Sequence, residues 1–168
     1  VKHLLENGCK RIAFLAGPKN VSVSNQRRLG YLRALSEAGI QEDSSLIIHS
    51  DYFQDTATSQ THQLMTSPNP PDGILVVSDR LALGVLVGMR ELKVRVPEDV
   101  KIVSFNNEPI CEVVSPTISS VAQPLEDIGK LALKLLIDQI EGRSEVGEPV
   151  IEVLKTQLVV RESSVSNS

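Results

Sequence analysis

The chain has 168 residues, of which 41% are hydrophobic and 23% are charged. This balance is typical of one well-buried globular domain and excludes a disordered or fibrous chain. Seventeen Lys and Arg residues against 21 Asp and Glu residues give a net charge of −4, which does not suit a surface that grips the DNA backbone. If nucleic acid is bound, we expect another part of the molecule to hold it.

The two cysteines and the hydropathy of the chain indicate its compartment. Cys9 and Cys111 form no CxxC pair, which favours reduced thiols over a disulfide framework. No uninterrupted apolar stretch approaches the length of about 20 residues that spans a bilayer. The first residues do not resemble a secretory signal. We therefore expect a cytoplasmic protein with no membrane partner.

Helical and strand patterns alternate along most of the chain. The strand patterns are short, apolar and β-branched, and they occur at 11–16, 46–49, 73–77 and 101–105. Helical patterns lie at 1–8, 22–38, 56–65 and 80–89. Ser22 or Ser24 is placed to cap the second helix, and Gly39 to end it. Successive β-α units predict an α/β fold, a doubly wound parallel sheet with helices on both faces.

The pattern changes after Pro116. Residues 117–122 form a polar, β-prone run, which predicts a strand or an extended crossover. Pro124 then starts a long helix whose apolar surface is wider than a half-exposed helix needs, so we expect it to require a large partner. Two β-type pieces at 150–154 and 157–160 follow. The polar, serine-rich tail after them is expected to be disordered.

The common motifs of α/β enzymes are absent from the sequence. It contains no GxGxxG, GxxxxGK[ST], GxSxG or HExxH motif. The three histidines lack the mutual spacing of a metal site, and each is more typical of a surface or core residue. Gly84 and Gly88 lie in one predicted helix, which we expect them to bring close to the sheet. The sequence thus predicts a protein that is no enzyme and needs no cofactor or metal.

Polar side chains end two neighbouring strands of the predicted sheet. Ser78 and Asp79 end one strand, and Asn106 and Asn107 end the next. Ligands of open α/β sheets bind at the carboxyl ends of the strands, so these residues are candidates to touch a ligand. With no nucleophile and base among them, they favour recognition over catalysis.

Five segments of the sequence carry a specific resemblance. They are Gly17-Pro18 with Arg27-Arg28-Leu29-Gly30-Tyr31, Val77-Ser78-Asp79-Arg80-Leu81-Ala82-Leu83-Gly84, Val96-Pro97-Glu98-Asp99-Val100, Ser104-Phe105-Asn106-Asn107, and Val121-Ala122-Gln123-Pro124 with Gly129. In order and spacing they resemble the effector-binding core of the lactose-repressor (LacI/GalR) family of bacterial transcription regulators, over about residues 1–161. In that family an amino-terminal helix-turn-helix binds operator DNA, and a two-lobed core similar to periplasmic sugar-binding proteins senses a small molecule.

The resemblance implies a division of the chain. Residues 1–116 would form the carboxyl-terminal lobe of the effector-binding core, and 117–124 the hinge crossover. The helix at 125–145 would belong to an amino-terminal lobe that is otherwise missing from this sequence, as is the DNA-binding segment. Return strands would lie at 146–161, before the disordered tail at 162–168.

The family places an effector-contacting arginine at the position of Arg27. A guanidinium suits that role because it donates two parallel hydrogen bonds to hydroxyls or to a carboxylate. The alternative is a solvated first-turn residue, although a cation there is mildly unfavourable. Asn106 stands where most members carry an aspartate, which favours a ligand with its own negative charge. The Phe-Asn-Asn form is similar to maltose-type regulators, which favours a neutral oligosaccharide instead, and both alternatives stay open.

Four further residues complete the implied effector site. Asp79 is a stronger candidate than Ser78, whose side chain is shorter than the asparagine of relatives, and either residue can instead cap the following helix. Gln123 matches a position near the hinge that contacts ligand in relatives, or it serves the crossover as a hydrogen-bonding residue. Tyr52 is placed to supply a stacking face for a sugar ring.

The resemblance also implies a homodimer. Relatives associate through the helix after the third strand and the segment after the fourth, which correspond to Leu83, Leu86, Val87, Pro109, Ile110 and Cys111. The chain is thus identified as the effector-binding and dimerisation part of a regulator, with a sugar as the expected small-molecule effector and operator DNA bound by a separate domain. A periplasmic-type sugar-binding protein shares the fold and is the alternative.

Overall fold

The computed structural model describes residues 1–143 and 151–165, and its strands form one sheet. The strand order is β2-β1-β3-β4-β5-β6. Strands β1 to β5 run parallel, and β6 at the edge runs antiparallel to β5. This arrangement confirms the predicted doubly wound sheet. The strands are β1 Ile12–Ala16, β2 Ile47–His49, β3 Gly73–Val76, β4 Lys101–Asn106, β5 Ser119–Ala122 and β6 Gln157–Val159.

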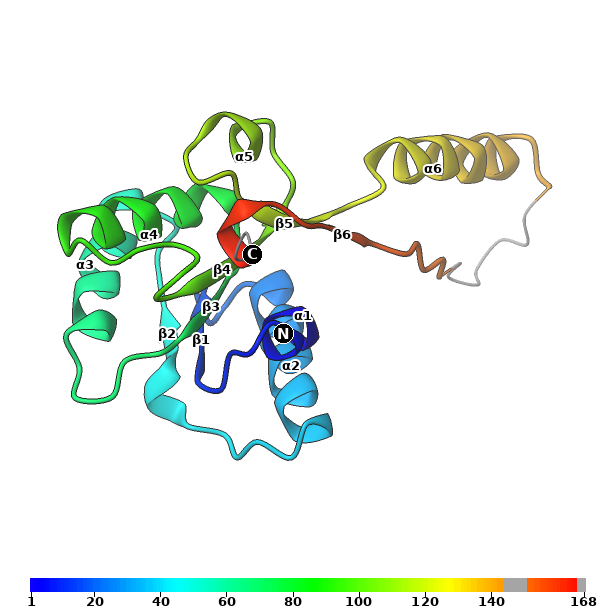
Figure 1. Cartoon of the computed structure of the whole chain (residues 1–168). Coiled ribbons are helices and arrows are strands. Elements are labelled where there is room, and N and C mark those ends of the chain that lie inside the picture. Colours follow the sequence, from blue (N-terminus) through cyan, green and yellow to red (C-terminus); the bar gives the residue numbers. More distant parts are fainter. Residues whose placement is uncertain (144–150, 166–168) are drawn as a thin grey trace.

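Helices cover both faces of the sheet. Helices α1 and α2 lie on one face, and α3 and α4 lie on the other (Figure 1). The short helix α5 joins β4 to β5, and α6 joins β5 to the segment that returns to β6. The helices are α1 Lys2–Glu6, α2 Ser22–Glu37, α3 Gln54–Met65, α4 Asp79–Glu91, α5 Ile110–Val113 and α6 Leu125–Ile140, with 3-10 turns at Ser44–Leu46 and Glu162–Ser164.

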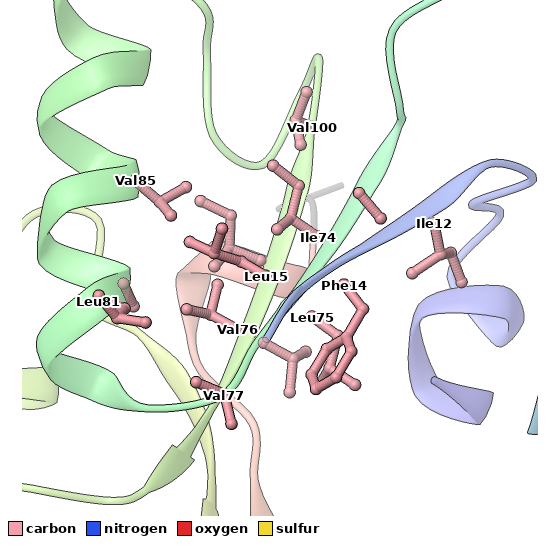
Figure 2. Packing of buried hydrophobic residues seen from close by; sticks show 14 of the residues in the cluster. Ile12, Phe14, Leu15, Ile74, Leu75, Val76, Val77, Leu81, Val85 and Val100 are labelled. Carbon is pink, nitrogen blue, oxygen red and sulfur yellow. The ribbon is translucent and has the colours of Figure 1, made fainter. Parts of the chain in front are cut away.

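The core lies on both sides of the central strands. All residues of β1 and β3 are buried. Figure 2 shows Leu15 and Val76 directed towards α4, and Phe14 and Leu75 on the opposite side of the strands. Phe14 stacks there against Tyr31 of α2, with ring centroids 5.4 Å apart. Strands that are buried on both faces account for the continuous apolar runs in the sequence.

The start of α2 differs from the sequence-based expectation. Val21 has an extended backbone and occupies the N-cap position, and it provides no side-chain cap. Ser22 is therefore already the first helical residue, and the hydroxyl of Ser24 is buried without a hydrogen-bond partner among the described residues. The prediction that Ser22 or Ser24 caps the helix is wrong, because a capping side chain must precede the first helical residue.

Gly84 and Gly88 bring α4 close to α3, and the prediction that they serve contact with the sheet is wrong. A Cβ atom on Gly84 would lie 2.3 Å from the carbonyl oxygen of Gln54, and one on Gly88 would lie 2.9 Å from Cβ of Thr61. Thr58 Oγ1 also donates a hydrogen bond to the carbonyl of Gly84 over 3.0 Å. Both glycines face α3, so their spacing along α4 reflects the close packing of these two helices.

The carboxyl-terminal segment is more ordered than its composition suggests. Ser163 and Ser164 are fully buried, and Ser163 Oγ donates to the carbonyl of Ile102 over 2.7 Å. The prediction of a disordered tail at 162–168 is wrong for residues 162–165, because buried partners satisfy the serine hydroxyls. Residues 166–168 lie outside the described part.

The return segment and α6 form an arm beside the sheet (Figure 1). Helix α6 forms where the sequence predicts it, but none of its residues is buried. Residues 151–154 form no strand, contrary to expectation, because no described strand lies beside them to pair with. Residue 150 and the segment 144–149 lie outside the described part. Among the described residues, no helix has the length and apolar character needed to cross a membrane.

Candidate functional site

Three polar side chains from distant parts of the sequence meet at the carboxyl end of the sheet. Asn106 ends β4, and its Oδ1 accepts hydrogen bonds from Arg27 Nη2 over 3.1 Å and from Gln123 Nε2 over 2.9 Å. Arg27 lies in the second turn of α2, and Gln123 directly follows β5. The structure therefore brings together Arg27, Asn106 and Gln123, of which the strand-end argument names Asn106 and the family resemblance implies Arg27 and Gln123.

The guanidinium of Arg27 is held in a half-buried position by uncharged groups. Its Cζ lies 4.4 Å from the centroid of the Phe105 ring, and Nη1 donates to the carbonyl oxygen of Val77. Burial lowers the pKa of Arg27, and the negative charge of Asp79 acts in the opposite direction. Within the described residues Arg27 has hydrogen bonds but no ion pair, so the site carries a positive charge. Phe105 was missed because it was counted only as a strand residue.

A cavity of about 500 Å³ adjoins this cluster, within the range of small-ligand sites. On the side of the sheet it is lined by Arg27, Phe105, Gln123 and Pro124. The opposite wall is formed by α6 and the return segment, through Ile128, Leu131, Ala132, Leu135, Glu152, Leu154 and Thr156. The cavity thus places hydrogen-bond donors on one wall and mainly apolar side chains on the other.

A second cavity, of about 650 Å³, lies between α2 and the sheet and shares Arg27 and Phe105 with the first. Its remaining lining is mainly apolar, with Val103 and Val121 of the sheet opposite Val23 of α2. Specific small-molecule sites combine apolar walls with a few convergent polar groups. The first cavity has both Arg27 and Gln123 in its lining, which favours it as the ligand site.

Asp79 does not belong to this cluster. Its side chain is fully buried, and its carboxylate accepts hydrogen bonds from the hydroxyl of Ser104, from Ser120 Oγ over 2.6 Å and from the backbone N–H of Glu108 over 2.7 Å. These donors come from β4, β5 and the turn after β4. Asp79 thus joins the ends of adjacent strands, and its geometry is that of an internal anchor, in contrast with the predicted effector contact.

Ser78 and Tyr52 also lie apart from the lining of the first cavity. Ser78 is the N-cap of α4, and its Oγ accepts from the backbone N–H of Leu81 over 3.4 Å, in agreement with the capping alternative. Tyr52 has a positive φ of 68°. Its hydroxyl end lies so close to Gly17 that a Cβ there would be 2.3 Å away. Tyr52 therefore covers the end of β1.

The turn that carries Asn106 has an unusual backbone. Asn106 has a φ of 111° and Asn107 a φ of 57°. Left-handed conformations of residues other than glycine cost about 1–3 kcal/mol each, and they persist only where surrounding contacts fix them. Here the N–H of Asn107 donates to Ser120 Oγ over 3.0 Å, and Glu108 is held by Asp79. The direction of the Asn106 amide therefore depends on contacts made by its neighbours.

The residues assigned to a dimer interface divide into two groups. Leu83 and Val87 of α4 are half-buried, as is Ile110, while Pro109 is exposed. By contrast, Leu86 is 9% exposed and Cys111 is fully buried. Burial and the nearby charge of Asp79 raise the pKa of Cys111 to about 12. Leu86 and Cys111 belong to the core of the lobe, so their expected place on an interface is not supported by their burial.

One serine–histidine contact lies within hydrogen-bond distance but is closed to substrates. His3 Nε2 lies 2.7 Å from Ser164 Oγ, which in turn lies 2.6 Å from Ser119 Oγ. Because Ser164 is fully buried, a substrate does not reach it. No group of three potential metal ligands occurs in residues 1–143 and 151–165.

Comparison with known proteins assigns the chain to a family. The model of the periplasmic binding protein-like domain matches residues 1–164. The chain belongs to the periplasmic binding protein-like domain family. Among its relatives are regulators. The "HTH-type transcriptional regulator CelR" of Thermobifida fusca is 36% identical over 162 residues, which are 96% of this chain and 47% of the relative.

Further relatives are also regulators. The "HTH-type transcriptional repressor CytR" of Escherichia coli K12 is 34% identical over 164 residues, 98% of this chain and 48% of the relative. The chain thus spans about half the length of these curated periplasmic binding protein-like relatives. The regulators and the matched domain agree with the predicted resemblance to the LacI family.

Solved structures support the same assignment. The "transcriptional regulator CelR-cellobiose complex" superposes with a TM-score of 0.88 at 36% identity, over 96% of this chain and 49% of that chain. A "regulatory protein of LacI family from Chloroflexus aggregans" superposes with a TM-score of 0.89 at 29% identity, over 97% of this chain and 58% of that chain. The chain therefore shares its periplasmic binding protein-like fold with regulators of the LacI family.

Proposed function

We propose that this chain is the effector-binding and dimerisation part of a LacI-family transcriptional regulator, and that a sugar or sugar derivative is its effector. The meeting of Arg27, Asn106 and Gln123 beside a cavity that α6 closes on the other side carries this proposal. The names of the relatives, which are HTH-type regulators, favour a cytoplasmic regulator over a periplasmic carrier.

The donors of the site suit oxygen-rich ligands. Because Oδ1 of Asn106 already accepts two hydrogen bonds, its amide N–H groups are the part that a ligand can use. Arg27 adds guanidinium N–H groups, and Phe105 adds an aromatic face. Hydroxyl and ether oxygens of sugars accept from such donors. The chemistry is that of recognition, so we expect the bound sugar to be released unchanged.

Effector binding acts on DNA through the arrangement of the lobes. A ligand held between two lobes stabilises the closed arrangement by its differential affinity for that state. In a dimer this changes the spacing of two DNA-binding segments, which alters their fit to two operator half-sites. Operator DNA is then a partner of the whole regulator, through a segment distinct from the residues described here.

Calorimetry on the full-length protein tests the effector. The panel contains cellobiose and maltose as neutral sugars, and glucose 6-phosphate and gluconate as charged ones. Binding of a neutral disaccharide supports the similarity to maltose-type regulators. Binding of the charged sugars alone would mean that the negative group of the ligand pairs with the guanidinium of Arg27. If no sugar in a broad panel binds, or if the sugar is recovered chemically altered, the proposal is wrong.

The proposed homodimer uses the half-buried residues of α4 and the exposed end of α5. Leu83 and Val87 lie on α4, and Val113 of α5 is 76% exposed. Leu83→Asp should give monomers in analytical ultracentrifugation, because a charge would be buried in an apolar contact. Leu29→Asp, on exposed α2, is the matched control and should leave the dimer intact. An unchanged dimer with Leu83→Asp would reject this surface.

A further inference from the structure

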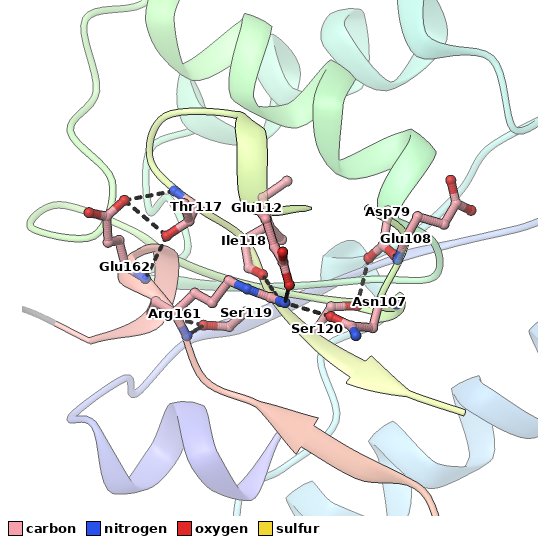
Figure 3. A network of polar contacts seen from close by, with 10 residues as sticks. All are labelled: Asp79, Asn107, Glu108, Glu112, Thr117, Ile118, Ser119, Ser120, Arg161 and Glu162. Atoms are coloured by element: carbon pink, nitrogen blue, oxygen red, sulfur yellow. Dashed lines mark hydrogen bonds and ion pairs between the residues drawn. The ribbon is translucent and has the colours of Figure 1, made fainter. Parts of the chain in front are cut away.

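Arg161 joins three separate segments near the candidate effector site. It follows β6, and its side chain is only 11% exposed. Figure 3 shows its guanidinium among the turn after β4, the helix α5 and the start of β5. Nη1 donates to Asn107 Oδ1 over 2.8 Å and to the carbonyl of Ile118 over 2.9 Å, and Nη2 donates to Glu112 Oε1 over 2.7 Å. A planar fork of donors suits this task, which a single ammonium group does not.

The contact with Asn107 bears on the effector site because of the backbone there. Asn106 and Asn107 both have positive φ values, a conformation that needs external support. The backbone of this turn is supported by Ser120 and Asp79. In the described residues, the side chain of Asn107 has its hydrogen bond from Arg161. Removing Arg161 therefore frees the side chain of Asn107 while leaving the other supports in place.

We propose that Arg161 is a positioning residue for the effector: it holds Asn107 in the left-handed conformation and thereby fixes the direction in which Asn106 presents its amide. The inference rests on the proposed function, since it assumes that Asn106 contacts the ligand. Arg161 touches neither the ligand cavity nor Asn106, and it acts through Asn107.

The position of Arg161 also connects the site to the arm. Its backbone is fixed to β5, because its N–H donates to Ser119 Oγ over 2.7 Å. Strand β6 ends two residues before Arg161 and pairs with β5 through Leu158 and Val121. The chain reaches β6 from α6. The chain thus links the arm, through β6 and Arg161, to the turn that carries Asn106.

The test uses Arg161→Met in the full-length protein, which keeps the apolar length of the side chain and removes the donors. Two quantities are measured: hydrogen exchange of the Glu108 amide without ligand, and the Kd for the tightest-binding sugar of the panel above. Exchange should become faster, and the Kd should rise about tenfold, which is the effect of losing one hydrogen bond to a charged group. An unchanged exchange rate and an unchanged Kd would overturn the proposal.

A second substitution separates positioning from general destabilisation. Glycine adopts a positive φ without strain, so Asn107→Gly in the Arg161→Met background should restore most of the lost affinity, although it restores no contact. A merely structural role of Arg161 predicts no such recovery, and its absence would also overturn the proposal. Glu112→Gln is the control: it removes the charge of the third partner and should leave the Kd unchanged.

The two readouts also distinguish the proposals from each other. If the wild-type protein binds no sugar, the proposed function fails, and the exchange of Glu108 in Arg161→Met and in the double variant still decides whether Arg161 holds the turn. If sugar binds tightly and neither readout responds to Arg161→Met, the positioning role fails while the proposed function stands.

Discussion

The sheet, which is covered by helices α1 to α4, and the arm, which is formed by α6 and the return segment, are both rich in apolar residues. Their burial is very different. Leu15 of β1 is 1% exposed, whereas Leu133 of α6 is 58% exposed. The sheet has helices on both faces, whereas α6 lies out beside the return segment (Figure 1), and none of its residues is buried. An amphipathic sequence predicts a helix, but the burial of its apolar face needs a second apolar surface opposite it. The described residues supply that surface to the sheet alone.

The largest effect on the free energy of unfolding is expected for a leucine of the sheet, in comparison with a leucine of the arm. Leu15→Ala should lower the free energy of unfolding by about 2–5 kcal/mol, because it opens a cavity in a closely packed core. Leu133→Ala, the matched change on the arm, should alter it by less than about 0.5 kcal/mol. Urea denaturation of both variants measures the difference. Equal losses would mean that α6 is covered as well as β1 is, for instance by a second copy of the chain.

The next effect concerns the anchor at the strand ends. Asp79→Ala should lower the free energy of unfolding by about 3 kcal/mol, because it leaves the hydroxyls of Ser104 and Ser120 and the N–H of Glu108 without their acceptor. Ser78→Ala removes only a helix cap and should cost about 1 kcal/mol. Thermal unfolding compares the two. If Asp79→Ala costs no more than Ser78→Ala but abolishes sugar binding, then Asp79 contacts the ligand after all.

Asp79 also illustrates how far sequence reasoning reaches. Apolar runs and their polar ends located the strands, the order of elements and the edge where Asn106 lies, because these follow from periodicity and from the parallel sheet. Arg27 was a candidate through the family resemblance. The direction of the Asp79 side chain depends on Ser104 and Ser120, which are distant in sequence and become neighbours only when β4 and β5 pair. No local pattern carries that information.

The errors elsewhere have the same origin. Gly84 and Gly88 have a spacing that indicates a close approach, but the surface they approach is set by the packing of α3. The serines of the tail are polar, and their burial depends on partners such as Ile102 of β4 and Thr117, which lies just before β5. Composition predicts the solvation of an isolated segment, and tertiary partners reverse it.

A smaller effect on stability, but a large one on binding, is expected for Arg27. Arg27→Met should weaken sugar binding by the full-length protein about 100-fold, since it removes a charged donor from a half-buried site. Arg28→Met changes the neighbouring residue, which points elsewhere on α2, and should change the Kd less than about twofold. Calorimetry with the same sugar measures both. If both variants bind alike, the cavity beside Gln123 is not the effector site.

The smallest expected effect is a dependence of stability on pH. We expect it to come from Asp99, which lies just before β4, and not from the arm. The side chain and the backbone of Arg95 both donate hydrogen bonds to Asp99: Nε and the backbone N each lie 2.9 Å from Oδ2. These hydrogen bonds lower the pKa of the exposed Asp99 from 3.8 to about 2. Since the folded-state pKa is the lower one, the stabilisation is fully present above pH 3.8 and is lost as the pH falls towards 2.

Asp99→Asn should therefore flatten the fall in stability between pH 4 and pH 2, to a degree that solvent screening keeps small. Asp127→Asn, at an exposed aspartate of α6, is the control and should leave the profile as it is in the wild type. Urea midpoints at successive pH values measure both. A profile that Asp99→Asn does not alter would mean that the pair with Arg95 adds nothing in solution, as many exposed ion pairs do.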